Sequence, residues 1–232
     1  MPTIRIVLID DERSAREEMK RMLQDYPDLA IVGEAANAAE ARKAISDLHP
    51  DLLFLDIQMP GESGFELLES LDSVPEIIFV TAFDQYALKA FEVSAIDYLM
   101  KPVRDERLAK AIEQFRRKQV SKPDPQVFIK DGNSYHLVRW SDVFLIESLD
   151  NYARLWFNDK KVLMKTSLNQ LETKLDPNLF FRANRAQIIQ LRFIEKINQI
   201  KGQMQVLLKN KTSVDVSIRQ AAKLKERTLH IH

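Results

Sequence analysis

The stretch Ile4-Arg5-Ile6-Val7-Leu8-Ile9-Asp10-Asp11 decides the fold class, because a nearly continuous apolar run ends in two carboxylates. Similar apolar runs recur at 29–32, 52–55, 77–80 and 96–100, and segments with helical spacing of apolar residues alternate with them. Strands that are apolar throughout need cover on both faces, and intervening helices supply it in a parallel sheet. We therefore predict an α/β domain over residues 1–119, with a doubly wound, five-stranded parallel sheet.

Composition excludes several classes of protein. The chain has 232 residues and no cysteine, which excludes disulfides, cysteine-bound metals and thiol catalysis. Its 45% hydrophobic and 29% charged residues are typical of a folded globular protein. Apolar runs fall far short of the ~20 residues that span a bilayer, and the first residues do not resemble a signal peptide. We expect a cytoplasmic protein with no membrane partner.

Charge is distributed unevenly along the chain. Residues 1–119 hold 15 Lys and Arg against 23 Asp and Glu, whereas residues 120–232 hold 19 against 11. Between these halves, residues 120–126 carry two prolines and no apolar period, which predicts a linker. The acidic half suits a metal ion or a basic partner, and the basic half suits a polyanion. Chance and attraction between the halves explain the asymmetry about as well from charge alone.

The second half, residues 127–232, is predicted to be a mostly antiparallel β domain. Many short strand-forming runs alternate there with polar breaks such as 131–133 and 201–202, and helical spacing is confined to 168–175 and 217–229. The segment contains no glycine-rich phosphate loop and no histidines at metal-ligand spacing. We therefore expect a binding function rather than an enzyme.

Polar residues follow the predicted strands of the first half. Asp10 and Asp11 follow the first strand, Asp56 the third, Thr81 the fourth and Lys101 the fifth. The carboxyl ends of parallel strands share one edge of a sheet, so these side chains should converge. Clustered carboxylates repel one another unless a cation joins them, and Mg²⁺ is the natural hard cation for oxygen ligands. Taken one at a time, the aspartates are explained as well by helix capping and turns.

Four motifs stand at these strand ends: Leu8-Ile9-Asp10-Asp11-Glu12, Asp56-Ile57-Gln58-Met59-Pro60-Gly61, Thr81-Ala82 and Lys101-Pro102. In combination they resemble the receiver domain of two-component response regulators, over roughly residues 1–119. The resemblance implies that Asp56 accepts a phosphoryl group from a sensor histidine kinase. It implies Mg²⁺ as cofactor, with these protein ligands: Asp10, Asp11, Asp56 and the backbone carbonyl of Gln58.

The same resemblance implies how a signal would be transmitted. Thr81 would hydrogen-bond the phosphoryl group and Lys101 would pair with it. Tyr98 stands where receivers have a switch aromatic, although a half-buried core tyrosine is the other interpretation. Movement of Thr81 toward the phosphoryl group would leave space for Tyr98 to turn inward. We expect the altered surface to form a homodimer on phosphorylation.

Three further motifs lie in the second half: 142–148 (DVFLIES), 180–189 (FFRANRAQII) and 216–219 (VSIR). They resemble the LytTR (LytR/AlgR) DNA-binding domain, over about residues 127–230. That family reads double-stranded DNA with loops of a β fold. The resemblance implies base or groove contacts by Arg185 and Arg219. It implies phosphate contacts by three further residues: Arg154, Arg182 and Lys223. Ala153, Ala186 and Gln190 depart from the common family pattern, which puts the exact base contacts in doubt.

The sequence thus predicts a response regulator that controls transcription. Its divisions are a receiver over 1–119, a linker over 120–126 and a LytTR-type domain over 127–232. Two other outputs stay open from the residues alone: RNA binding, since basic charge does not choose the polymer, and docking of a protein. An aspartyl-phosphate hydrolase is disfavoured, because it wants a second Asp two residues after Asp56, where Gln58 stands.

Overall fold

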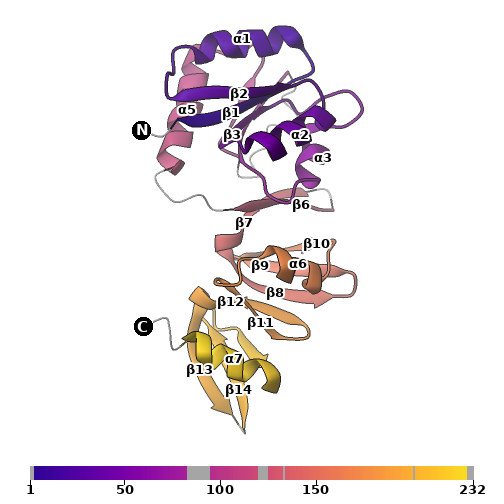
Figure 1. The fold of residues 1–232 in the computed structure, drawn as a ribbon, viewed down its shortest axis with the longest axis vertical. Coiled ribbons are helices and arrows are strands. Elements are labelled where there is room, and N and C mark those ends of the chain that lie inside the picture. Colours follow the sequence, from indigo (N-terminus) through magenta and orange to yellow (C-terminus); the bar gives the residue numbers. More distant parts are fainter. Residues whose placement is uncertain (1–2, 83–94, 120–124, 133, 201, 229–232) are drawn as a thin grey trace. The chain divides into compact units, whose positions relative to one another are not determined.

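The structure is a computed structural model, and it describes residues 3–82, 95–119, 125–132, 134–200 and 202–228. The chain divides into two compact units, residues 1–140 and residues 141–232. Most of the predicted linker, residues 120–124, lies outside the described residues. Each unit is coloured by sequence in Figure 1, from indigo at the N-terminus to yellow at the C-terminus.

The first unit is built on a parallel sheet, with strand order β2-β1-β3-β4-β5, which confirms the predicted fold class. The strands are β1 (Ile4–Ile9), β2 (Leu29–Ala35), β3 (Leu52–Leu55), β4 (Glu76–Thr81) and β5 (Asp97–Met100). The helices are α1 (Arg13–Leu23), α2 (Ala38–Leu48), α3 (Gly64–Glu69) and α5 (Asp105–Gln119).

The sheet is buried on both faces because successive strand residues point to opposite sides. In β1, Ile6 and Leu8 join a core with α1 and α5, whereas Val7 and Ile9 join a second core with α2 and α3. Figure 1 shows the helices on the two faces of the sheet. A strand buried on both faces must be apolar at nearly every position, which is the pattern in the sequence.

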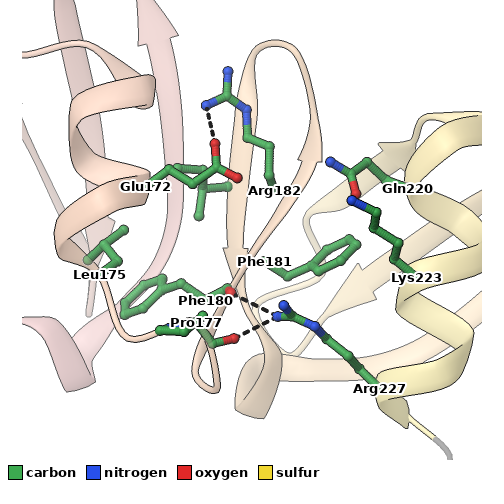
Figure 2. Close-up of a pocket in the computed structure, with 10 residues that line it drawn as sticks. Glu172, Leu175, Pro177, Phe180, Phe181, Arg182, Gln220, Lys223 and Arg227 are labelled. Atoms are coloured by element: carbon green, nitrogen blue, oxygen red, sulfur yellow. Dashed lines mark hydrogen bonds and ion pairs between the residues drawn. The ribbon is translucent and has the colours of Figure 1, made fainter.

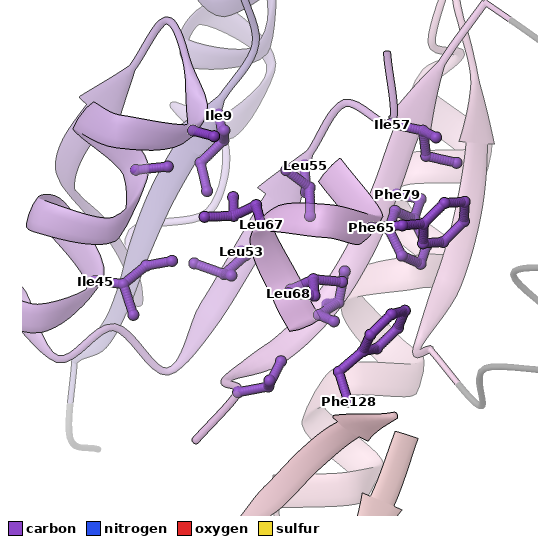
Figure 3. Packing of buried hydrophobic residues seen from close by; sticks show 14 of the residues in the cluster. Ile9, Ile45, Leu53, Leu55, Ile57, Phe65, Leu67, Leu68, Phe79 and Phe128 are labelled. Carbon is purple, nitrogen blue, oxygen red and sulfur yellow. The ribbon is translucent and has the colours of Figure 1, made fainter. Parts of the chain in front are cut away.

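A two-stranded hairpin completes the first unit. Strands β6 (Gln126–Asp131) and β7 (Ser134–Arg139) pair in antiparallel fashion. Phe128 lies in the core beside α3, with its ring 6.0 Å from that of Phe65, and Tyr135 stacks on Phe65 at 4.7 Å. Figure 3 shows Phe128 reaching from the hairpin toward Phe65 and Leu68.

Polar contacts also hold the hairpin. The buried Gln126 donates its side-chain amide to the carbonyl of Pro75, and Val74 and Gln126 form a β-bridge. Glu76 accepts from both Lys118 and Arg139. In space the chain therefore divides after Trp140. The domain division expected from the sequence, with a linker over 120–126, places this hairpin in the second domain. That division stays a prediction.

The second unit is mostly antiparallel, as predicted. One sheet has the order β10-β9-β8-β12-β11 and the other the order β13-β14-β15. Its strands are β8 (Val143–Leu149), β9 (Tyr152–Phe157), β10 (Lys160–Met164), β11 (Phe180–Asn184), β12 (Gln187–Gln190), β13 (Ile194–Ile200), β14 (Gln203–Leu208) and β15 (Ser213–Val216). Its helices are α6 (Leu168–Lys174), which begins with a capping box at Ser167, and α7 (Ile218–Thr228).

Candidate functional site

The predicted acidic cluster forms at the carboxyl end of the parallel sheet. The amide of Asp56 donates to the carbonyl of Ile9 at 2.8 Å, so the β1–β3 pairing brings the end of β3 beside Asp10. Carboxylate oxygens of Asp10, Asp11 and Asp56 lie within 4.8 Å of one another. Asp10 and Asp56 are buried, at 6% and 5% exposure, whereas Asp11 is exposed. Two buried carboxylates this close require positive charge nearby.

Lys101 supplies that charge. Its ammonium nitrogen lies 2.7 Å from Oδ2 of Asp10 and 2.7 Å from Oδ2 of Asp56. Burial raises the pKa of the Asp10 carboxyl, although the hydrogen bond from Lys101 opposes this. Burial opposes the charge of Lys101 as well, but its hydrogen bonds to Asp10 and Asp56 outweigh burial and raise the pKa of the ammonium. The ammonium is therefore charged at neutral pH.

Backbone amides fix the orientation of both buried carboxylates. Oδ1 of Asp10 accepts from the amide of Glu12 at 3.0 Å, and Oδ1 of Asp56 accepts from the amide of Gln58 at 3.1 Å. In each residue the other oxygen, Oδ2, forms the ion pair with the Lys101 ammonium. The following turn is tight: a β-carbon on Gly64, the first residue of α3, would lie 2.5 Å from the backbone oxygen of Asp56. Only glycine fits there without a shift of the loop that follows Asp56.

Thr81 and Tyr98 lie where the strand order predicts. The amide of Lys101 donates to the carbonyl of Thr81 at 2.9 Å, which places the ends of β4 and β5 side by side. Thr81 is fully buried, and its hydroxyl oxygen has no hydrogen-bond partner in the described part of the chain. A buried hydroxyl without a partner is costly, and a bound anionic group would relieve that cost. Tyr98 is buried at 9% exposure, and its role as a switch stays a prediction.

The donor set fits a magnesium ion. Three carboxylates from two strand ends, one of them exposed to solvent, match the preference of Mg²⁺ for oxygen ligands with retained water. Asp10, Asp11 and Asp56 would hold the ion. The fourth predicted ligand, the carbonyl of Gln58, belongs to the residue whose amide holds Asp56.

In the second unit, backbone hydrogen bonds join three segments at one edge. The amide of Ser148, next to the β8–β9 turn, donates to the carbonyl of Ala186 at 2.8 Å. The amide of Ser217, before α7, donates to the carbonyl of Ala183 at 2.9 Å. Residues 183–187, which include the turn from β11 to β12, thus join the other two segments. We name this surface, residues 148–152, 184–187 and 215–219, the loop edge.

Asn184 organises the loop edge, and the sequence analysis did not select it. Its side-chain amide donates to the carbonyl of Asp215 at 2.7 Å and to Gln187 at 2.9 Å, while its oxygen accepts from the amide of Ala186 at 2.8 Å. One side chain therefore holds its own turn and the end of β15. An Asn in a turn, two residues before the amide that it accepts, is the signal that could have found it.

The predicted DNA contacts differ in their surroundings. Arg185 and Arg219 are exposed, and their side chains make no hydrogen bond or ion pair with another described residue. Lys223 is exposed on α7. Arg154 lies 4.0 Å from Glu147, a loose ion pair.

Arg182 braces the turn that carries Arg185. Its guanidinium donates to the carbonyls of Asn184 at 2.7 Å and Arg185 at 2.6 Å, and its side chain is 14% exposed. A guanidinium has further N–H groups, so the phosphate contact of Arg182 stays a prediction.

A cavity of about 120 Å³ lies between α6, β11 and α7 (Figure 2). On one side Arg227 donates to the carbonyl of Pro177 at 2.6 Å and lies over the ring of Phe181 at 5.4 Å. On the other side Arg182 meets Glu172 at 3.5 Å. The Arg227 contacts anchor α7 to β11 and to the residues before it, and the Arg182 pair joins β11 to α6. None of the described helices is long and apolar enough to cross a membrane.

Comparison with known proteins identifies two domains in the chain. The model for the response regulator receiver domain matches residues 6–113, and the model for the LytTr DNA-binding domain matches residues 133–228. The second match starts within the β6–β7 hairpin. Among solved structures, the response regulatory domain of mrkE from Klebsiella pneumoniae is 25% identical with a TM-score of 0.47, covering 51% of this chain and 100% of that one. A LytTr DNA-binding domain from Bacillus cereus is 21% identical with a TM-score of 0.42, covering 46% and 98%.

Curated relatives match over nearly the whole length. The transcriptional regulatory protein BtsR of Escherichia coli (strain K12) is 36% identical, covering 96% of this chain and 98% of that protein. The sensory transduction protein LytT of Enterococcus faecalis is 33% identical with the same coverage. Two domain matches in one chain and full-length relatives lead to one conclusion. The chain belongs to the response regulators that join a receiver domain to a LytTR DNA-binding domain.

Proposed function

We propose that Asp56 accepts a phosphoryl group from a sensor histidine kinase, and that phosphorylation promotes homodimerisation and sequence-specific binding to double-stranded DNA in the cytoplasm. The chain thereby regulates transcription without catalytic turnover of its own. The observation that carries this proposal is the Lys101 ammonium, held 2.7 Å from both Asp10 and Asp56 and next in sheet pairing to Thr81, whose buried hydroxyl has no partner among the described residues.

The geometry suits phosphoryl transfer to a carboxylate. An oxygen of Asp56 attacks the phosphorus of a phosphohistidine, a P–O bond forms, the P–N bond breaks, and the leaving imidazole takes a proton from solvent. Asp56 and the phosphoryl donor are both anionic, so Lys101 lowers the repulsion between them. Bound Mg²⁺ would supply further charge neutralisation at the same carboxylates.

Phosphorylation changes the balance of charge at this edge. It adds about 1.5–2 negative charges next to Lys101 and Thr81. The Thr81 hydroxyl then gains an acceptor, and its movement toward the phosphoryl group leaves space into which Tyr98 turns. We propose that the altered surface pairs two copies of the chain, so that their basic units bind adjacent half-sites with a high effective concentration.

In the second unit, Arg185 and Arg219 make base or groove contacts, and Arg154, Arg182 and Lys223 meet phosphates. The convergence of three segments at the loop edge supports this assignment, because the exposed arginines lie on two of the joined segments. Arginine suits both tasks, since it attracts phosphates and reads guanine edges with two hydrogen bonds.

A phosphotransfer assay tests the first step. Phosphoryl label from a purified sensor kinase should appear on the wild-type chain and be absent from Asp56→Asn, while circular dichroism shows that the variant is folded. Label on the variant would refute the site. Addition of beryllofluoride and Mg²⁺ to the full chain should give a dimer in sedimentation, and a monomer would refute the pairing step.

Competition binding tests the output. Duplex DNA should displace a labelled duplex far better than RNA of the same sequence, with an affinity that falls steeply as salt rises. Equal competition by RNA would refute the choice of polymer. Binding without salt dependence would refute phosphate contacts.

A further inference from the structure

Ile218 is the most exposed large apolar side chain among the described residues. It is 91% exposed, whereas the other large apolar side chains on the described surface are 36–48% exposed. Isoleucine is among the residue types most often buried, since removal of its apolar side chain from water is favourable. Ile218 is the first residue of α7, so helix packing leaves it without cover.

The neighbourhood of Ile218 combines apolar and cationic side chains. Leu149 and Tyr152, exposed by 37% and 42%, lie on the β8–β9 turn of the same loop edge. Three of the exposed large apolar residues thus lie on segments that are joined at the loop edge. Arg185 and Arg219 flank them with exposed guanidinium groups that make no ion pair with any other described residue.

The positive charges beside these apolar residues indicate which class of partner binds this surface. Unpaired arginines attract a polyanion and disfavour a purely apolar protein partner. In the major groove of DNA the C5-methyl of thymine is the apolar group that distinguishes one base, and aliphatic side chains contact it. An exposed isoleucine beside groove-reading arginines therefore has a chemical partner in duplex DNA.

We propose that Ile218 packs against a thymine C5-methyl in the major groove and adds a preference for thymine beside the base contacted by Arg219. This inference rests on the proposed DNA-binding function and deepens it, because it assigns part of the specificity to an apolar contact. Arg219 and Arg185 supply attraction and hydrogen bonds, and Ile218 supplies discrimination by a methyl group.

Replacement of thymine by deoxyuridine tests the contact, since it removes only the methyl group. A duplex is first selected with the full chain from a random library, and each thymine is then replaced singly. With wild-type protein, one position per half-site should lose about fourfold in affinity, the factor for about 0.8 kcal/mol per buried methyl at 1.4 kcal/mol per tenfold. With Ile218→Ala, the thymine and uracil duplexes should bind equally at that position.

Two variants serve as controls. Ile218→Val keeps a branched aliphatic side chain and should retain sensitivity to uracil. Leu179→Ala removes another exposed apolar side chain, 40% exposed and outside the loop edge, and should bind both duplexes as the wild type does. Because the Ile218 side chain is almost fully solvated, Ile218→Ala should leave the circular dichroism spectrum and thermal midpoint unchanged.

The outcomes separate the inference from the function on which it rests. Failure to select any duplex would overturn both. A selected duplex whose uracil profile is the same for the wild type and Ile218→Ala would overturn the inference alone. A loss of self-association in Ile218→Ala, seen in sedimentation without DNA, would also overturn it, because Ile218 would then belong to an interface between copies.

Discussion

Replacement of Phe128 by alanine should destabilise the first unit strongly, although this residue lies beyond the predicted receiver. Phe128 is 3% exposed, and its ring lies 6.0 Å from Phe65 and 5.4 Å from Tyr135. A buried Phe→Ala change costs about 3–5 kcal/mol, which includes the lost transfer energy and the cavity. We expect a loss of about 4 kcal/mol in the free energy of unfolding of this unit.

Urea unfolding measures this loss. The chain has two tryptophans, so a Trp156→Phe background leaves Trp140, at the end of the hairpin, as the fluorescent reporter. With a denaturant slope of about 2 kcal/mol per molar urea, the midpoint should fall by about 2 M. If the alanine variant does not fold, Phe128→Leu replaces it. This variant keeps much of the apolar volume but loses the ring contacts, so its midpoint should fall by less than about 2 M.

The matched control lies on the same hairpin. Lys130 is exposed and contributes a cation–π contact with Tyr135 at 5.7 Å. Lys130→Ala should cost at most about 1 kcal/mol. If Phe128→Ala moves the midpoint no further than Lys130→Ala, the hairpin does not stabilise the first unit, and the division of the chain after Trp140 is wrong.

Three further predictions concern the DNA-binding surface and one ionisable pair. Arg219→Ala should weaken specific DNA binding by about 1–3 kcal/mol in a titration of a selected duplex, and an unchanged footprint would count against the contact. Asn184→Ala should release the joined segments of the loop edge, so specific affinity should fall in the same titration while α7 stays helical by circular dichroism; full affinity would show that Asn184 is dispensable. Burial lowers the pKa of the Lys118 ammonium despite its hydrogen bond to Glu76. The unfolded chain therefore holds this proton more tightly, and relative to Lys118→Met the wild type should gain stability as pH rises from the folded pKa toward the ordinary lysine pKa of 10.5. Parallel pH profiles of urea unfolding for the two proteins would contradict this.

Much of the receiver site was predictable because its physics is local to strand ends. Apolar runs identified the strands, and the strand order of a doubly wound sheet places the residue after each strand at one edge. Asp10, Asp56, Thr81 and Lys101 could therefore be grouped before any coordinate was known. The exact contact of Lys101 with two carboxylates could not, because it depends on a side-chain conformation set by burial and charge.

The loop edge was less predictable. Resemblance pointed to its three segments, but sequence spacing does not show that Asn184 ties two of them together or that Arg182 braces the turn. Asn184 looked like an ordinary polar position in a strand-rich half, and Arg182 was expected only to contact phosphate. Asn184 acts through a hydrogen bond to Asp215, 31 residues away in the sequence, and Arg182 acts through hydrogen bonds to its own turn.

The amino-acid sequence alone determined the two fold classes, the acidic cluster and the basic character of the second half, because periodicity, strand-end position and charge are properties of short stretches. Tertiary structure alone decided that the β6–β7 hairpin joins the first unit and that Ile218 stands uncovered. Both depend on which distant surfaces meet. Phe128 packs against Phe65, whereas the Ile218 side chain stays 91% exposed. Apolar residues are alike in sequence, and only packing distinguishes the buried from the exposed.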